Sequence, residues 1–189
     1  AIGAGAGNPP VVVDETADIK KAAVDIVNGC SFDNNLPCIA EKEIVAVDSI
    51  ADELIANMKA NGAYELKDPA IIEKMVDMVT KDRKKPQVGF VGKSAQYILD
   101  KVGIQVGPEV KVILLEAPKD HPFVQIELMM PILPLVRVPN VYKLTKMAKI
   151  TSAAIVEISG WGYFYYSYKN DAGLKRYFLN IMLPSQFFH

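Results

Sequence analysis

The sequence predicts an α/β fold in which a largely parallel sheet is flanked by helices. Short β-branched runs alternate along the chain with segments whose apolar residues recur at helical spacing. Strands that alternate with helices are typical of parallel sheets with right-handed crossovers. Half of the 189 residues are hydrophobic, which is ample for a packed core, so we expect a globular chain of one domain or slightly more.

Two strand–helix units open the chain. Residues 10–13 form the first expected strand, and a helix over 19–29 follows it, ended by an Asn-Gly pair. Residues 43–47 form the second expected strand, and Ser49 is the candidate N-cap of a helix that ends at another Asn-Gly pair, 61–62. The apolar stripes of the two helices are Ile19, Ala22, Ala23, Ile26 and Val27, and Ile50, Ala51, Leu54, Ile55 and Met58.

Two further helices are expected in the middle of the chain. Asp68, followed by Pro69 at the first helical position, is typical of a helix start. A shorter helix runs from Ser94 to Val102 and is stopped by Gly103. The longer of the two carries an apolar stripe of Ile71, Ile72, Met75, Val76 and Val79.

Three strands and a hairpin are expected after these helices. The strands cover 110–115, 123–126 and 132–138. Pro134 cannot donate to a sheet ladder, so we expect it at a sheet edge or at the start of its strand. Aromatic residues on either side of a turn predict a C-terminal β-hairpin over 161–183.

Composition and charge argue against several classes of partner. With 21 basic and 22 acidic residues, the net charge of −1 gives no electrostatic reason to expect binding to nucleic acid or to a membrane surface. No apolar run approaches the length of a membrane span. Cys30 and Cys38, in a sequence without a signal peptide, indicate free thiols in a reducing compartment, so we expect a cytoplasmic protein.

Neither a metal site nor a phosphate-binding loop is predicted. His121 is the only internal histidine, and no second histidine or cysteine stands at ligand spacing, which favours a turn residue. Gly3, Gly5 and Gly7 lack the spacing of a dinucleotide fingerprint, and no strand precedes them.

Cys38 is the strongest candidate for a nucleophile. It ends a polar segment, 31–38, between a predicted helix and a predicted strand. Pro37 disfavours a helix running into the thiol, and the Asp-Asn-Asn stretch favours a turn whose backbone amides are free to bind an oxyanion. The alternative is a small hydrophobic loop residue, because an unperturbed thiol is a poor nucleophile at neutral pH.

Five segments of the sequence resemble the CoA-acylating aldehyde dehydrogenases that act on acetaldehyde, propionaldehyde or butyraldehyde. The resemblance covers roughly the first three quarters of the chain, which is about the length of an ordinary α/β domain. The segments are 7–18, 31–38, 47–54, 91–95 and 127–134, the last of which is similar to the glutamate-to-proline motif of aldehyde dehydrogenases.

The resemblance implies a mechanism and two site residues. Cys38 matches the family's nucleophile, whose thiolate attacks the aldehyde to form a thiohemiacetal. The thiohemiacetal gives a hydride to NAD or NADP, and the acyl group of the resulting thioester passes to coenzyme A. The backbone N–H of Cys38 matches one donor of the oxyanion hole. Glu127 matches the glutamate that binds the nicotinamide ribose; its alternative interpretation is an exposed carboxylate at a strand end.

Ala4 bears on the acyl acceptor. In hydrolytic aldehyde dehydrogenases a glutamate at the aligned position activates water, and alanine has no base chemistry. A thiol such as that of coenzyme A needs less activation than water, so the resemblance implies acyl transfer to coenzyme A.

The sequence also departs from the family. The amino-terminal half of the family's members supplies most of their cofactor-binding fold, and this sequence has no counterpart of it. The likeness to the family fades after about residue 150. We therefore expect a partial catalytic domain over 1–150 and a diverged segment over 151–189. Two functions remain open: a catalytic portion that needs a cofactor-binding half, or a catalytically silent fragment or oligomerisation module. The resemblance is also compatible with assembly into homo-oligomers and with a location in a bacterial microcompartment.

Overall fold

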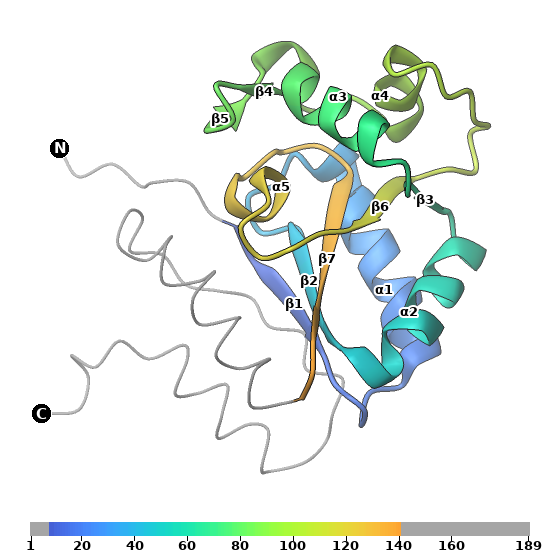
Figure 1. The fold of residues 1–189 in the computed structure, drawn as a ribbon. Helices are drawn as coiled ribbons and strands as arrows, with labels where there is room; N and C mark the ends of the chain where they lie inside the picture. The colour runs from blue at the N-terminus through green and yellow to red at the C-terminus, as the bar shows by residue number, and fades with distance from the viewer. Residues whose placement is uncertain (1–7, 141–189) are drawn as a thin grey trace, which may run out of the picture.

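The structure is a computed structural model, and it describes residues 8–140 (Figure 1). The aromatic hairpin over 161–183 and the expected boundary at residue 150 lie outside this range. So do the glycines of the first seven residues and Ala4. These predictions stay predictions.

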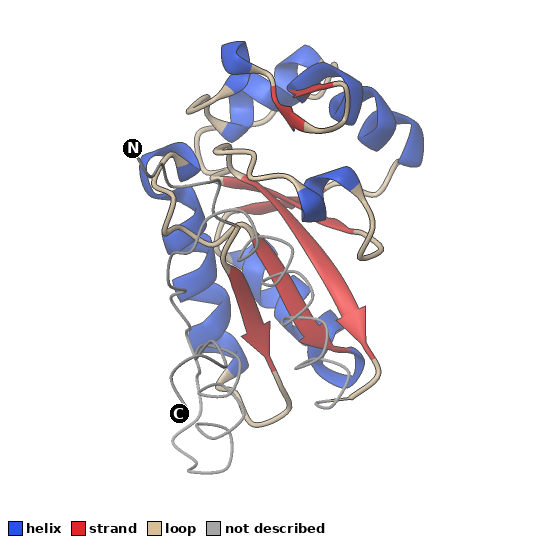
Figure 2. Ribbon diagram, turned by 90° about the vertical axis from the view of Figure 1, so that its left-hand side faces the viewer, coloured by secondary structure: helices blue, strands red, loops and turns tan. Residues whose placement is uncertain are grey.

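A five-stranded parallel sheet forms the centre of the described region. Figure 2 shows the long strand arrows running in the same direction. This sheet confirms the expected α/β class. Across it the strands lie in the order β1 (Pro10–Val13), β2 (Glu43–Val47), β7 (Ile132–Val138), β6 (Val112–Glu116) and β3 (Ala63–Glu65).

Helices cover both faces of the sheet. The first pair packs with one face, and the other three pack with the opposite face. In Figure 1, α1 and α2 run beside the strands while α3 and α4 lie at the top of the view. The helices are α1 (Ile19–Ser31) and α2 (Asp48–Ala60), then α3 (Pro69–Val79), α4 (Ala95–Lys101) and α5 (Pro122–Gln125).

The remaining described elements are short. They are the 3-10 turns η1 (Phe32–Asn35) and η2 (Val88–Phe90), and a small antiparallel hairpin of β4 (Thr80–Lys81) and β5 (Lys85–Pro86).

The strands are apolar on both faces, as a sheet between two helix layers requires. Alternate residues therefore belong to different cores. The core with α1 and α2 takes Val11, Val13, Ile44, Ala46, Val112, Leu114, Leu133 and Leu135, whereas the core with α3, α4 and α5 takes Ile113, Leu115 and Ile132.

The prediction of a strand over 123–126 is wrong, because Pro122–Gln125 forms α5. Pro122 occupies the first helical turn, where its missing N–H costs nothing. His121 caps the helix, since its Nδ1 accepts a hydrogen bond from the N–H of Phe123 at 3.2 Å. Phe123 is fully buried, and an apolar run this short does not distinguish a strand from one buried helical turn.

Acidification is expected to weaken this cap. Burial lowers the pKa of His121 despite the opposing charge of Glu73, so the unfolded chain binds more protons below the unfolded value of about 6.5. The free energy of unfolding should therefore fall as pH drops through about 6.5 toward the lower folded pKa. Urea unfolding across that window measures the effect. His121→Asn keeps a capping acceptor that does not titrate, and an unchanged pH dependence in this variant would contradict the prediction.

Helix α1 continues past the Asn28-Gly29 pair and ends at Ser31, later than expected. Gly29 serves a different purpose from helix termination. A Cβ at this position would lie 2.2 Å from Oε2 of Glu41, so the glycine allows a buried carboxylate to approach the helix.

Pro134 lies in β7, the central strand, and not at a sheet edge or strand start. The carbonyl of Leu135 accepts from the N–H of Ala117, next to β6, so the alternate residue Pro134 faces the β2 side. Pairing of β7 with β2 begins only at Leu135. The missing N–H therefore removes no bond of that ladder.

Smaller differences concern where elements begin. Helix α2 starts at Asp48, directly after β2, so Ser49 lies in its first turn and is not the N-cap. Strand β6 spans Val112–Glu116 where 110–115 was expected. Strand β3 was not predicted, since three residues are too few to show a period.

Candidate active site

Cys38 and Glu127 lie at the same edge of the sheet. Cys38 is in the loop that precedes β2, and Glu127 is in the loop that precedes β7. These two strands are neighbours and run parallel, so the loops at their amino ends meet at one edge. The topology thus brings together two residues that are far apart in the sequence.

Ligands of open α/β sheets usually bind beyond the carboxyl ends of the strands. In this protein that edge carries an ion-pair network. Arg137, near the end of β7, binds Asp48 at 3.1 Å, Asp52 at 2.5 Å and Glu116 at 2.6 Å. The candidate site is at the opposite, amino edge.

Cys38 is exposed, as the sequence predicts. It is a central residue of a turn that is closed by a 3.1 Å hydrogen bond from the N–H of Ala40 to the carbonyl of Pro37. Among residues 8–140, no hydrogen bond occupies the N–H of Cys38. This thiol therefore has solvent access and a backbone donor beside it.

The segment before the turn has an unusual backbone. Asp33, Asn34 and Asn35 have φ angles of 47°, 52° and 64°, in the left-handed region. Asp and Asn tolerate this region better than other residues that carry a Cβ. The Asp-Asn-Asn run therefore allows the chain to turn back sharply between α1 and the thiol.

The buried side chain of Asn35 fixes the base of this loop. Its Nδ2 donates to the carbonyl of Cys30 at 3.0 Å and to the carbonyl of Glu41 at 2.8 Å. The end of α1 and the start of the β2 approach are thereby joined through one amide.

Lys42 is buried beneath the turn. Its ammonium donates to the carbonyl of Asn35 at 2.8 Å, to Oδ1 of Asn35 at 2.6 Å and to the carbonyl of Pro37 at 2.9 Å. Burial lowers the pKa of Lys42, and negative charge on nearby groups opposes this, with Glu127 first and Cys38 among them. The ammonium is thus within electrostatic reach of both predicted site residues.

The second cysteine has different surroundings. Cys30 is fully buried in the core, and burial, followed by the charge of Glu41, raises its pKa to about 12. A thiol that stays protonated and buried does not act as a nucleophile. Of the two thiols, Cys38 is the reactive candidate.

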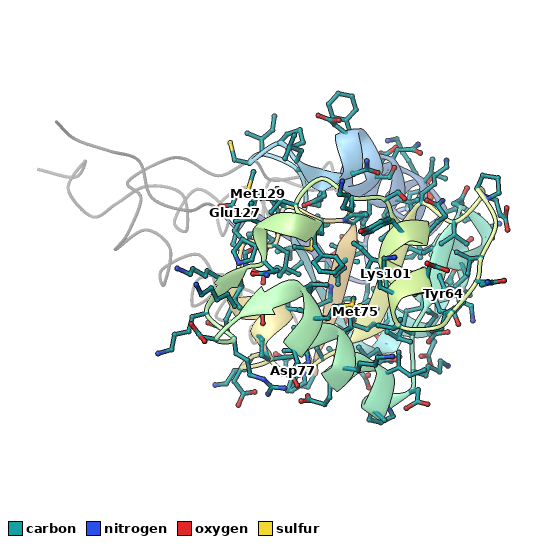
Figure 3. All side chains as sticks on the ribbon, turned by 90° about the horizontal axis from the view of Figure 1, so that it is seen from above. Tyr64, Met75, Asp77, Lys101, Glu127 and Met129 are labelled. Carbon is teal, nitrogen blue, oxygen red and sulfur yellow. The ribbon has the colours of Figure 1, made fainter. Side chains whose placement is uncertain are left out.

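Glu127 is half-buried in the loop between α5 and β7. Met129, two residues later, has a left-handed φ of 54°. In Figure 3 the two residues lie together, across the view from Tyr64 of the edge strand β3.

Gly92 joins the Cys38 loop to the Glu127 loop. Its carbonyl accepts from Nδ2 of Asn34 at 3.0 Å, and its N–H donates to the carbonyl of Met129 at 2.9 Å. The φ of Gly92 is +70°, which glycine adopts without strain. One residue therefore sets the spacing of the two loops.

We expect Gly92→Ala to lower the free energy of unfolding by about 1 kcal/mol or more, because a Cβ is strained at positive φ. Space is not the reason, since the nearest atom would be Cδ1 of Leu36 at 3.7 Å. Urea unfolding measures the change. Gly89→Ala is the matched control, because its Cβ would meet nothing within 4 Å and its φ is not positive. Equal stability of the two variants would contradict this role of Gly92.

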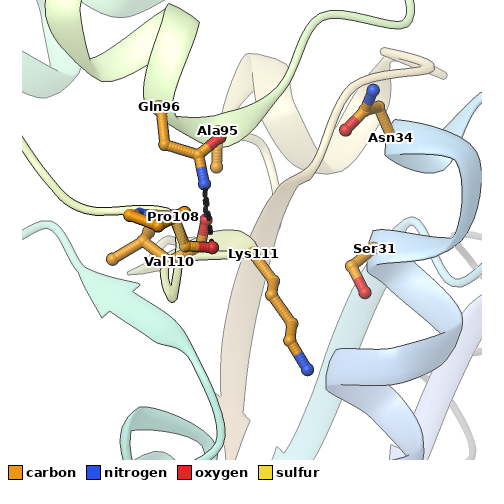
Figure 4. Close-up of a pocket in the computed structure, with 7 residues that line it drawn as sticks. All are labelled: Ser31, Asn34, Ala95, Gln96, Pro108, Val110 and Lys111. Carbon is orange, nitrogen blue, oxygen red and sulfur yellow. Dashed lines mark hydrogen bonds between the residues drawn. The ribbon is translucent and has the colours of Figure 1, made fainter.

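A cavity of about 190 Å³ lies behind the Cys38 loop, between the end of α1 and the start of α4 (Figure 4). In Figure 4 the side chain of Lys111 extends from the β6 side of the cavity toward α1. Neither Cys38 nor Glu127 lines this cavity, so it is separate from the candidate site. Its lining residues are Ser31, Asn34, Ala95, Gln96, Pro108, Val110 and Lys111.

Within the described range, no group of three or more histidine, cysteine or acidic side chains is arranged to hold a metal ion. No helix among residues 8–140 is long and apolar enough to cross a membrane.

Comparisons with known proteins place these residues in context. No protein-family profile matches the chain. Acetaldehyde dehydrogenase (acetylating) of Salmonella typhimurium is 45% identical over 152 residues, which cover 78% of this chain and 32% of that protein. Propanal dehydrogenase (CoA-propanoylating) of the same organism is 47% identical over 142 residues, covering 74% and 30%.

A solved structure gives a closer match. Propionaldehyde dehydrogenase of Rhodopseudomonas palustris, with bound CoA and an acylated cysteine, superposes with a TM-score of 0.87 at 54% identity. The match covers 96% of this chain and 40% of that one. The chain is a partial homologue of the CoA-acylating aldehyde dehydrogenases.

This chain spans about a third of the length of the curated CoA-acylating aldehyde dehydrogenases that it matches. The fold and the sequence likeness therefore concern that portion of such an enzyme.

The sequence did not reveal the roles of two residues that contact the loops of the candidate site. Lys42 stands in a Glu-Lys-Glu run just before a strand, where alternating charge usually indicates solvent exposure. Gly92 lies in a segment that resembles the CoA-acylating aldehyde dehydrogenases, but its contacts with both loops are long-range. The Asp-Asn-Asn run before Cys38 was the one available signal, because a loop with a strained backbone needs other residues to hold it.

Proposed function

We propose that the protein carrying this sequence oxidises a short-chain aldehyde to an acyl-CoA through a thioester on Cys38. The observation that supports the proposal most directly is the exposed thiol on a hydrogen-bonded turn, at the same sheet edge as Glu127. The matched relatives are named for this reaction.

In this proposal the sulfur of Cys38 bonds to the carbonyl carbon of the aldehyde. The carbonyl oxygen becomes an oxyanion, to which the N–H of Cys38 donates a hydrogen bond. Bound NAD or NADP supplies the acceptor for the hydride that leaves that carbon, so the aldehyde carbon is oxidised to a thioester. The thiolate of coenzyme A then bonds to the acyl carbon, the bond to Cys38 breaks, and the free Cys38 thiolate is restored.

Glu127 fits the role of cofactor ligand by its chemistry and its position. A carboxylate accepts hydrogen bonds from the neighbouring hydroxyls of a ribose, and this one is half-buried at the same edge as the thiol. We propose that Glu127 orients the nicotinamide ribose so that the cofactor faces the carbon bound to Cys38. One solved relative, an engineered glycolyl-CoA reductase, is described with bound NADP+.

The setting of the reaction is also a proposal. We expect the isolated chain to show little turnover, because most of the relatives' length has no counterpart in it. We propose a bacterial cytoplasm or microcompartment as its location, since one solved relative comes from a fucose-utilisation microcompartment of Clostridium phytofermentans. We also propose that the full-length protein associates into homo-oligomers.

Thiol labelling of the 189-residue chain tests the proposal. Iodoacetamide should alkylate Cys38 well before Cys30, because one thiol is exposed and the other is buried with a raised pKa. Peptide mass mapping over time gives both rates, and Cys38→Ser verifies the assignment. Equal, slow labelling of both thiols would favour a catalytically silent fragment or an oligomerisation module.

A further inference from the structure

We propose that Lys42 is a positioning residue, whose buried ammonium holds the Cys38 turn in its reactive geometry. The inference rests on the proposed function, because it assigns Lys42 to the nucleophile of that reaction. Nothing in the resemblance to known dehydrogenases gives this lysine a role.

The contacts of Lys42 are unusual for a lysine. The side chain is 4% exposed, and burying an ammonium is costly unless its hydrogen bonds are satisfied. An ammonium has three N–H donors, and here three oxygens receive them: the carbonyl of Asn35, Oδ1 of Asn35 and the carbonyl of Pro37. Both residues belong to the segment that leads directly into Cys38.

The backbone that Lys42 holds is strained. Asp33, Asn34 and Asn35 are all left-handed, and such residues persist only where the surroundings determine them. The Asn35 and Pro37 carbonyls point to the same ammonium from either side of Leu36. Lys42 therefore fixes the end of the strained run and the first residue of the turn that presents the thiol.

Charge gives Lys42 a second connection to the site. The ammonium interacts with the carboxylate of Glu127 and with the thiolate of Cys38, and both attractions favour the charged lysine. The Lys42 ammonium therefore places a positive charge next to the turn that carries Cys38. A neutral side chain of the same length would keep the packing and lose both effects.

Hydrogen exchange in the 189-residue chain tests the positioning role. Lys42→Met keeps an unbranched side chain, one atom shorter, and removes its charge and donors. The turn amides of Leu36 and Ala40, which donate to Asp33 and Pro37, should then exchange about tenfold faster or more, a factor that corresponds to about 1.4 kcal/mol. Amides of α1 and β2 should keep their rates. The control is Lys20→Met, on the exposed face of α1.

A second readout follows the thiol itself. Alkylation of Cys38 by iodoacetamide should be slower in Lys42→Met than in Lys20→Met, because the thiolate loses its neighbouring positive charge. In Lys42→Ala, added propylammonium should restore both the alkylation rate and the slow amide exchange. Tetramethylammonium has the same charge and no N–H donors, so it should restore neither.

Each outcome decides the proposal. Three results together support it: faster amide exchange confined to the turn, slower alkylation of Cys38, and rescue by propylammonium but not by tetramethylammonium. Rates equal to those of Lys20→Met overturn it, and so does faster exchange throughout the chain, which would make Lys42 a general core residue. Should Lys42→Met not fold, Lys42→Gln retains amide donors and should give intermediate rates. The proposed function fails separately, if wild-type Cys38 is alkylated as slowly as Cys30.

Discussion

Replacing Cys38 with serine is expected to abolish acyl-CoA formation by the full-length protein that carries this sequence. Removing a nucleophile costs about 10³-fold or more in rate, because the covalent route is closed. A serine hydroxyl stays protonated at neutral pH and has no base beside it in the proposed mechanism. The measurement is the steady-state rate of acyl-CoA formation from aldehyde, cofactor and coenzyme A.

The control for this substitution is stability. Cys38 is exposed and makes no packing contribution to the core, so Cys38→Ser should leave the free energy of unfolding within about 0.5 kcal/mol of wild type. Cys30→Ala, by contrast, should lower stability because it empties part of a buried site, while activity per folded molecule persists. Activity that survived in Cys38→Ser and disappeared in folded Cys30→Ala would contradict the assignment.

Replacing Glu127 with glutamine is expected to slow hydride transfer selectively. Hydrogen bonds to a charged group contribute about 1.5–3 kcal/mol, so we expect a loss of about tenfold or more in the rate at which reduced cofactor forms. Acyl exchange between propionyl-CoA and labelled coenzyme A needs the thiol of Cys38 and no hydride step, so its rate should change little. Stopped-flow absorbance of the reduced cofactor and the exchange assay separate the two steps.

Glu53→Gln is the matched control, because Glu53 lies on the exposed face of α2, away from both loops. It should change neither rate. An equal fall of both rates in Glu127→Gln would show that the substitution disturbs the Cys38 loop, for instance through Lys42, and would contradict a role confined to the cofactor.

The fold class could be predicted from the sequence because its main elements obey simple local rules. Strands 10–13 and 43–47 are short β-branched runs, and the expected strand 132–138 has the same bounds as β7. Helix α3 begins where Asp68 and Pro69 predict, and the Asp68 carboxylate accepts from the N–H of Ala70 at 2.9 Å. These features depend on neighbours in sequence.

Two errors arose where distant contacts decide. Gly29 does not end α1, because it leaves room for the carboxylate of Glu41. Pro134 is tolerated in the central strand because pairing with β2 begins one residue later. Neither contact is visible in a local window of sequence. The error at 123–126 has a local cause, because His121 caps a helical turn only two residues away and an apolar run this short fits a strand or a helix equally well.

The candidate site was predictable only where local sequence determines it. The position of Cys38 in a turn followed from Pro37 and the Asp-Asn-Asn run. Glu127 was found through resemblance alone, since its approach to the Cys38 loop depends on the pairing of β2 with β7. Lys42 was missed because only the folded chain brings its ammonium under the turn.

Mapping a trapped acyl group tests the central claim most directly. The full-length protein would be incubated with propionaldehyde and NAD or NADP in the absence of coenzyme A, quenched, digested and analysed by mass spectrometry. We predict a propionyl group on the peptide that contains Cys38, released as propionyl-CoA when coenzyme A is added before the quench. A propionyl group on another residue, or acyl-CoA formation with Cys38 unmodified throughout turnover, would contradict the account.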